Sequence, residues 1–128
     1  MGKKVLFINN VRSLLLISGL LSKMGYQVDL VHNVDTGLVK LEEHDYDIVI
    51  MLESPDVESW TICVRIRNLT DVPLIVISLN ASTETSIKAI NAGADYFLRK
   101  PFGPLEFLAR INSLLQRTSS RPSISITS

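Results

Sequence analysis

Two uninterrupted apolar runs constrain the fold of this chain more than any other feature. Residues 47–52 read Ile-Val-Ile-Met-Leu after one Asp, and residues 73–78 are apolar between an initial Pro and a final Ser. Because neither run alternates apolar with polar side chains, each predicted strand must be covered on both faces. Sheets covered on both faces are typically parallel, with helices packed against them. The two runs therefore predict a layered α/β domain.

Strand and helix patterns alternate along the whole chain. Strands are predicted at residues 3–8, 27–31, 47–52, 73–78 and 95–98, and helices at 11–24, 33–44, 60–68, 82–92 and 104–117. Asn33 can cap the second helix, and Gly25 and Gly93 follow two other helices as natural stops. The core face of the last helix is expected to comprise Leu105, Leu108, Ile111, Leu114 and Leu115. This order predicts a parallel sheet with helices on both faces and right-handed crossovers.

Composition and charge exclude several classes of function. The 128 residues are 46% hydrophobic and 20% charged, which is typical of a folded domain. Thirteen basic residues balance thirteen acidic ones, so this domain is not expected to bind nucleic acid by itself. Cys63 is the only cysteine, and neither His32 nor His44 has a second ligand at metal spacing, so we predict no metal site. No targeting or membrane-spanning segment is visible, and we expect a cytoplasmic protein that does not contact a membrane.

Ligand sites in parallel sheets of this kind lie beyond the carboxyl ends of the strands. Four segments are predicted to meet there: residues 9–10, 52–54, 78–80 and 98–101. The chemistry of any site should therefore be sought in these segments.

At these strand ends the chain resembles a bacterial response-regulator receiver domain of the CheY-like kind. The strongest stretch, residues 91–102, reads Asn-Ala-Gly-Ala-Asp-Tyr-Phe-Leu-Arg-Lys-Pro-Phe. Other family-like motifs are Tyr46-Asp47, Arg65-Ile66-Arg67, and Asp71-Val72-Pro73 with Ser78. The resemblance covers residues 3–117. It implies a flavodoxin-like (βα)5 fold, a doubly wound five-stranded parallel sheet with helices on both faces.

Residues 104–117 resemble the last helix of the OmpR/PhoB-type subfamily. In that subfamily a Ser/Thr-rich linker leads to a winged-helix DNA-binding domain, and residues 118–128 contain seven Ser or Thr among eleven positions. We interpret residues 1–117 as the receiver domain and residues 118–128 as a flexible tail or linker. DNA would then be bound only through a C-terminal domain beyond this segment.

The resemblance implies phosphoryl transfer from a histidine kinase to an aspartate with the help of Mg²⁺, but this chain departs from that pattern. The acidic pair after the first strand is replaced by Asn9 and Asn10, and the phospho-acceptor position falls on Leu52. Two amides and an isobutyl group supply neither an anionic ligand for Mg²⁺ nor a nucleophile. We predict no catalytic residue, no enzymatic activity, no cofactor, and Mg²⁺ binding that is lost or very weak. Whether a kinase partner exists stays open.

Glu53 is the nearest carboxylate and the possible substitute acceptor. Since side chains alternate along a strand, it should point away from the side of Leu52, unless the shortened loop turns it inward. The resemblance places Ser78, Phe97 and Lys100 at switch positions. Lys100 could pair with Glu53 or lie in solvent. Ser78 is either a switch hydroxyl or a strand-end serine that bonds nearby backbone. Phe97 is expected to be buried, and an inward position is also the active-like one in this family.

Charges on the fourth helix, fifth strand and fifth helix suggest the symmetric homodimer of the subfamily. The residues concerned are Lys88, Asp95, Tyr96, Glu106, Arg110 and Arg117. By position, Lys88 would meet Glu106 of a second copy. Likewise, Asp95 would meet Arg117 of that copy, whereas Arg110 lacks its usual acidic partner. The alternative is that these charges form ordinary solvated faces.

These features favour an atypical, phosphorylation-independent receiver domain of a two-component system. It would dimerise and control a C-terminal DNA-binding domain in transcription regulation. The alternative is a binding module that senses a small ligand or a protein partner in place of phosphate. An enzyme of the same topology is a third hypothesis, but no Gly-rich phosphate loop follows the first strand. A fourth is weak phosphoryl acceptance by Glu53. Cys63 is expected to pack, and Trp60 is either half-buried or an exposed contact.

Overall fold

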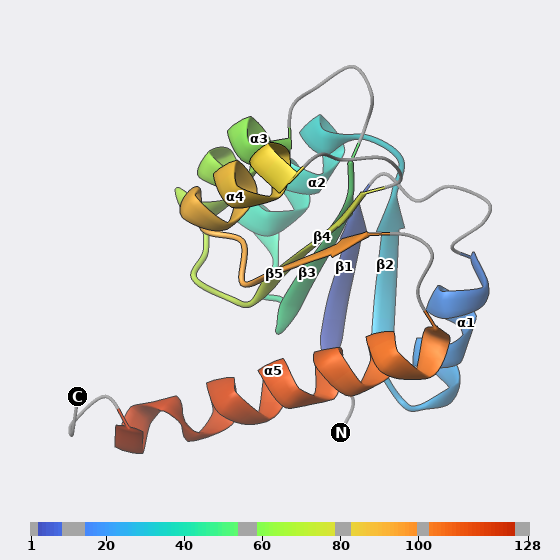
Figure 1. Ribbon diagram of the computed structural model, residues 1–128. Helices are drawn as coiled ribbons and strands as arrows, with labels where there is room; N and C mark the ends of the chain where they lie inside the picture. The colour runs from blue at the N-terminus through green and yellow to red at the C-terminus, as the bar shows by residue number, and fades with distance from the viewer. Residues whose placement is uncertain (1–2, 9–14, 54–58, 79–82, 100–102, 125–128) are drawn as a thin grey trace.

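The computed structural model describes residues 3–8, 15–53, 59–78, 83–99 and 103–124, with the backbone alone for residues 15–17, 83 and 117–124. Strands and helices alternate along the chain (Figure 1). Their bounds are β1 Lys4–Ile8, α1 Leu15–Lys23, β2 Gln27–Val31, α2 Val34–Glu43, β3 Ile48–Leu52, α3 Ser59–Arg67, β4 Leu74–Ser78, α4 Thr83–Asn91, β5 Tyr96–Arg99 and α5 Pro104–Ile124. The strands form one parallel sheet in the order β2-β1-β3-β4-β5. The predicted flavodoxin-like α/β fold is confirmed.

Helices cover both faces of the sheet, as the two apolar runs predicted (Figure 1). On β3, Ile48, Ile50 and Leu52 pack in the core cluster that contains residues of α1 and α5. Val49 and Met51 pack in the second cluster, with residues of α2, α3 and α4. The side chains of β3 thus alternate between two apolar layers, which explains why the strand has no polar position.

The predicted helix ends are confirmed where their capping signals are strong. The side-chain oxygen of Asn33 accepts a hydrogen bond of 2.8 Å from the backbone N–H of Thr36. Gly25 and Gly93 follow α1 and α4 with positive φ angles of 95° and 120°. L-residues with a side chain rarely adopt this backbone conformation, so these glycines end their helices.

The predicted core face of α5 needs one correction. Leu105 is 80% exposed, whereas Phe107, which the prediction left out, is fully buried. The buried residues Phe107, Ile111 and Leu114 recur at the spacing of one helical face. Leu105 lies two positions before Phe107, a rotation of about 200° around the helix axis. It therefore points to solvent, and its assignment to the core was wrong.

Helix α5 also ends later than predicted. The predicted helix stopped at residue 117, whereas α5 continues to Ile124, so helical backbone covers much of the segment interpreted as a linker. Each non-proline residue that extends an existing helix adds one hydrogen bond, and Ser and Thr cost only a fraction of 1 kcal/mol each relative to Ala. The Ser and Thr residues therefore do not mark the end of the helix. Pro122 has no N–H and costs about 3 kcal/mol inside a helix, and its inclusion in α5 has no explanation in helix propensity. Among the residues that the structure describes, no helix is both long and apolar enough to cross a membrane.

Candidate functional site at the carboxyl ends of the strands

Leu52 ends β3 as a core residue. Its side chain is buried in the cluster of α1 and α5, and its Cα is paired with that of Ile77 on β4. An aliphatic side chain in this position has no nucleophilic atom and no access to a phosphoryl donor. Three other predicted site residues, Asn9, Asn10 and Lys100, lie outside the described residues, so their expected roles and the Lys100–Glu53 pair stay predictions.

Glu53 and Ser78 meet at the carboxyl end of the sheet. The backbone N–H of Glu53 donates to the carbonyl oxygen of Ile77 at 2.7 Å, which continues the β3–β4 register by one residue. Ser78 is fully buried, and its hydroxyl donates a hydrogen bond of 2.6 Å to Oε1 of the Glu53 carboxylate. This is the length of a charge-assisted O–H···O⁻ bond, which is stronger than a bond between neutral groups. The sequence placed both residues at this edge, but their direct contact was not foreseen.

The Glu53 carboxylate also influences α3. Its charge contributes, as the smallest of several causes, to the rise in the pKa of Cys63, a residue of α3 that packs in the second core cluster. That Glu53 points away from the side of Leu52 stays a prediction from the alternation of side chains along a strand. Glu53 itself is partly buried at the end of the sheet.

Cys63 is a packing residue. Its side chain is fully buried, and this burial raises the pKa of the thiol to about 11, although the nearby Arg67 charge acts in the opposite direction. The thiolate is the nucleophilic form of cysteine, and it is scarce at neutral pH when the pKa lies this high. The structure thus supports the expectation that Cys63 packs.

The two aromatic residues of β5 point to opposite faces of the sheet. Phe97 packs against the cluster of α2, α3 and α4, but it is only partly buried, whereas a buried side chain was expected. Tyr96 packs against the other cluster, and the guanidinium of Arg110 on α5 lies 4.8 Å from the centre of its ring. The ring face attracts the cation, so Tyr96, which stands where the subfamily usually carries the acidic partner of Arg110, contacts Arg110 within the same chain.

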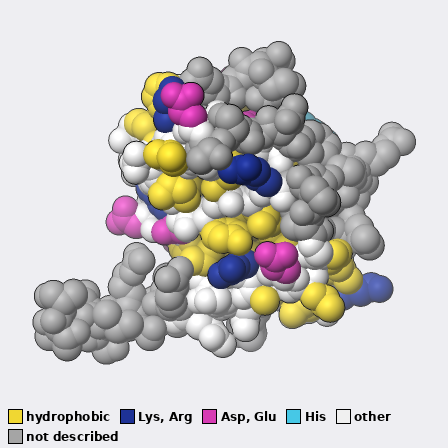
Figure 2. Space-filling model, in the orientation of Figure 1, with side chains coloured by type: hydrophobic (Ala, Val, Ile, Leu, Met, Phe, Trp, Pro, Cys, Tyr) yellow, Lys and Arg dark blue, Asp and Glu magenta, His cyan; other side chains and the backbone are white. Residues whose placement is uncertain are grey.

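The α4–β5–α5 face carries exposed apolar side chains among charged ones. Figure 2 shows such a mixture on the side of the molecule where these three elements lie. Ile87 and Ile90 of α4 and Leu105 of α5 are exposed, and so are the predicted interface residues Glu106 and Arg110. Apolar side chains ringed by charges are typical of a surface that contacts another protein.

Two further predicted interface residues also have contacts within the chain. The ammonium group of Lys88 lies 5.9 Å from the centre of the Trp60 ring, and Trp60 is half-buried rather than fully exposed. Asp95 Oδ2 accepts hydrogen bonds from Arg67 Nη2 at 2.7 Å and from the backbone N–H of Leu74 at 2.8 Å. Any pairing of Lys88 or Asp95 with a second copy stays a prediction, and the side chain of Arg117 lies outside the described residues.

Arg67 joins three segments near the amino ends of β4 and β5. Its guanidinium donates to the backbone oxygens of Gly93 at 2.9 Å, Val72 at 2.5 Å and Thr70 at 3.3 Å, and it also forms the ion pair with Asp95. A Cβ on Gly93 would lie 2.6 Å from Cγ of Arg67. The sequence offered Arg67 only as part of a family-like motif, because its partners lie up to 28 residues away along the chain.

The strand ends supply few metal ligands. The described residues include no group of three or more His, Cys, Asp or Glu that could hold a metal ion. Next to the described ends of β1, β3, β4 and β5, Glu53 is the one carboxylate, and it already accepts the hydrogen bond from Ser78. Mg²⁺ prefers carboxylates together with water in an octahedral arrangement, so this donor set fits the ion poorly.

Comparisons with known proteins agree with the α/β fold of the chain. The model of the "Response regulator receiver domain" family matches residues 9–112. The response regulator ArlR of Staphylococcus aureus (strain NCTC 8325) is 33% identical over 107 residues, which are 83% of this chain and 49% of that protein. The chain therefore spans about half the length of the curated relatives it matches.

Solved receiver structures have the same fold. The CheY-like receiver domain of Methanospirillum hungatei JF-1 has a TM-score of 0.87 and 25% identity, over 94% of this chain and 99% of that one. A two-component response regulator of Clostridium difficile has a TM-score of 0.84 and 26% identity, over 91% and 98% of the two chains.

Proposed function

The chain belongs to the response regulator receiver domain family, and we propose that it is an atypical member that works without phosphorylation. The observation that carries this proposal is the hydrogen bond of 2.6 Å from the Ser78 hydroxyl to the Glu53 carboxylate. In this proposal the input chemistry of the family is replaced by a permanent contact between two side chains.

The chemistry of the acceptor position supports the loss of input. The buried Leu52 has no atom that could accept a phosphoryl group. Without a carboxylate pair there is no strong Mg²⁺ site to neutralise the charge of an incoming phosphoryl group, and we expect Mg²⁺ binding to be absent or very weak. The domain then acts as a binding and switching module and not as an enzyme.

The Glu53–Ser78 hydrogen bond takes the place of the contact that a phosphoryl group would otherwise make with the switch hydroxyl. In the family, the switch hydroxyl is the group that responds to the phosphoryl oxygens. Here a carboxylate oxygen is already within hydrogen-bond distance of the Ser78 hydroxyl, and Phe97 already packs inward. Both features correspond to the active-like arrangement of the family. In this proposal the residues of the chain itself therefore keep the domain in its active-like conformation, without a phosphoryl group.

In the proposed active-like conformation, the domain forms a symmetric homodimer through the α4–β5–α5 face. Apolar contact through Ile87, Ile90 and Leu105 would provide most of the affinity. Exposed charged groups such as Glu106 and Arg110 would set the register of the two copies, since rim ion pairs contribute more to specificity than to affinity.

In a longer protein this dimer would position two DNA-binding domains. The Ser/Thr-rich composition of residues 118–128 supports a linker to such a domain, and the relative ArlR is about twice as long as the region that it shares with this chain. DNA-binding dimers with two-fold symmetry place their half-sites about one helical turn apart, so the receiver dimer would fix this spacing. We place this activity in transcription regulation in the cytoplasm.

Removal of the Ser78 hydroxyl tests the proposal. In Ser78→Ala the Glu53 carboxylate loses its donor, and a hydrogen bond to a charged group contributes about 1.5–3 kcal/mol. We expect the dissociation constant of the dimer to rise about tenfold or more in sedimentation equilibrium, since 1.4 kcal/mol corresponds to a factor of ten. Ser22→Ala, an exposed serine on α1, is the matched control and should leave the dimer unchanged.

An unchanged dimer in Ser78→Ala, with normal folding by circular dichroism, would show that the Glu53–Ser78 bond does not control assembly. A second variant tests the surface itself. Ile87→Asp should abolish the dimer, whereas Val64→Asp, a similarly exposed residue on α3, should not. If both variants dimerise normally, the α4–β5–α5 face is not the interface.

A further inference from the structure

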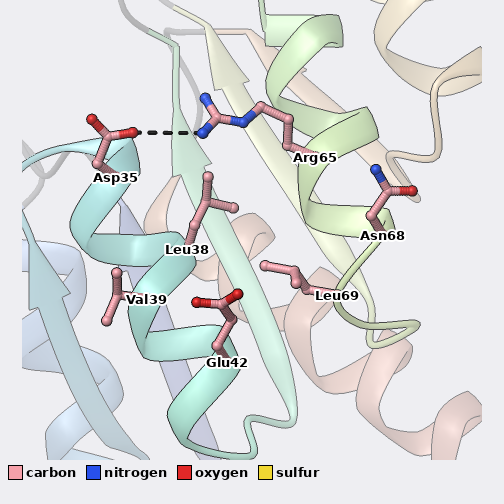
Figure 3. A pocket seen from close by; sticks show the side chains of 7 residues that line it. All are labelled: Asp35, Leu38, Val39, Glu42, Arg65, Asn68 and Leu69. Atoms are coloured by element: carbon pink, nitrogen blue, oxygen red, sulfur yellow. Dashed lines mark ion pairs between the residues drawn. The ribbon is translucent and has the colours of Figure 1, made fainter.

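We infer that the groove between α2 and α3 is a docking site for a partner protein, which inserts a Lys or Arg side chain of an amphipathic segment. The groove has a volume of about 420 Å³ and is lined by side chains of both helices (Figure 3). It does not include Glu53 or Ser78, nor any residue of α4, β5 or α5. The proposed function therefore leaves this site unused.

The groove offers apolar surface to a partner. Leu38 is buried beneath it, while Val39 on α2 and Leu69 just after α3 are 47% and 38% exposed on its two sides. Val64 continues the exposed apolar surface one turn before Asn68 on α3. The exposed faces of these two helices are otherwise polar, and they thus keep a strip of aliphatic side chains in contact with water.

Charges are placed at the two ends of the groove. Near the start of α2, Asp35 forms an ion pair of 3.6 Å with Arg65, and both side chains are exposed (Figure 3). Glu42 lies two turns further along α2, on the side of Leu69 (Figure 3), and has no ion pair within the described part of the chain. The far end of the groove is therefore left with an uncompensated negative charge.

This arrangement fits a cationic side chain with an apolar stem. The methylene groups of a Lys or Arg can lie along Leu38, Val39 and Leu69, while the charged head reaches the Glu42 carboxylate. Charge complementarity thus favours a basic partner over an acidic one.

The openness of the groove favours a protein segment over a small molecule. Small-molecule sites typically enclose most of the surface of their ligand, whereas both sides of this groove carry exposed side chains. Binding of an amphipathic helix in a groove is a recurring mode of peptide recognition. The apolar residues that anchor such a helix recur every three or four positions. A partner helix with Leu and Arg on one face would match it.

A titration with a defined peptide tests this inference. The probe is an acetylated and amidated helical peptide with Leu and Arg on one face, added to the ¹⁵N-labelled chain. The amide signals of Val39, Glu42, Asn68 and Leu69 should shift saturably. Glu42→Lys should weaken binding about fivefold, as expected when an attractive exposed pair becomes a repulsive one. Glu43→Lys makes the same charge change outside the groove and should alter the affinity less than twofold.

Other outcomes would overturn the inference. If Glu42→Lys and Glu43→Lys weaken peptide binding equally, the peptide is held by general attraction between charges and not by the groove. Equal binding of a matched peptide with Glu in place of Arg would remove the cationic specificity. Groove signals that shift with chain concentration before peptide is added would identify a second copy as the occupant, and no saturable shift would leave the groove without a partner of this chemistry. None of these results depends on the Ser78→Ala experiment.

Discussion

Replacing Phe107 by Ala should lower the free energy of unfolding by about 4 kcal/mol, as measured by urea denaturation. Phe107 is fully buried in the cluster between α5 and the sheet, so the substitution removes apolar contacts and leaves a cavity in a close-packed layer. Leu105→Ala, two residues earlier on the same helix, should change the free energy by less than about 0.5 kcal/mol because Leu105 is exposed.

The comparison of these two variants distinguishes the observed helix orientation from the one expected from sequence. If Leu105→Ala destabilises the domain as much as Phe107→Ala, α5 packs through the other side. That result would also remove Leu105 from the proposed dimer face.

Replacing Arg67 by Ala should cost about 3 kcal/mol, since hydrogen bonds to charged groups contribute about 1.5–3 kcal/mol and this side chain is half-buried. The substitution removes donors from three backbone oxygens and from Asp95. Arg65→Ala is the matched control on the same helix. Its exposed ion pair with Asp35 at 3.6 Å should contribute at most about 1 kcal/mol. Thermal unfolding followed by circular dichroism measures both effects.

The Arg67 variant also has a local consequence. Arg67 holds the Gly93 carbonyl and the Asp95 carboxylate, which together lead from α4 into β5. Its removal should therefore increase hydrogen exchange at the α4–β5 turn more than in the rest of the sheet. If Arg67→Ala and Arg65→Ala are equally stable, the contacts of Arg67 contribute nothing beyond those of a surface residue.

The sequence predicted the fold well because the relevant signals are local. The apolar runs that form β3 and β4 do not alternate with polar residues, so these strands must be covered on both faces. The capping residues Asn33 and Gly93 act within one turn of the helix ends that they mark. By contrast, Leu105 and Phe107 are both apolar, and only the packing of α5 decides which of them is buried.

The candidate site could be predicted only in part. Strand alternation predicts that Leu52 and Glu53 lie on opposite sides of the sheet, since this follows from backbone geometry. The contact between Glu53 and Ser78 joins residues 25 positions apart, and it depends on the register of β3 with β4. The network of Arg67 depends in the same way on long-range pairing. Sequence periodicity carries no information about such contacts until the strands have been placed.

Sedimentation velocity at several protein concentrations, with and without Mg²⁺ plus beryllofluoride, tests phosphate independence most directly. Beryllofluoride mimics a phosphoryl group on a carboxylate and requires the metal and acceptor that this chain is proposed to lack. We expect a dimer in plain buffer, with the same dissociation constant when the mimic is present. A monomer that becomes a dimer only with Mg²⁺ and beryllofluoride would contradict the account, because it would mean that a carboxylate of this chain still accepts the phosphoryl group.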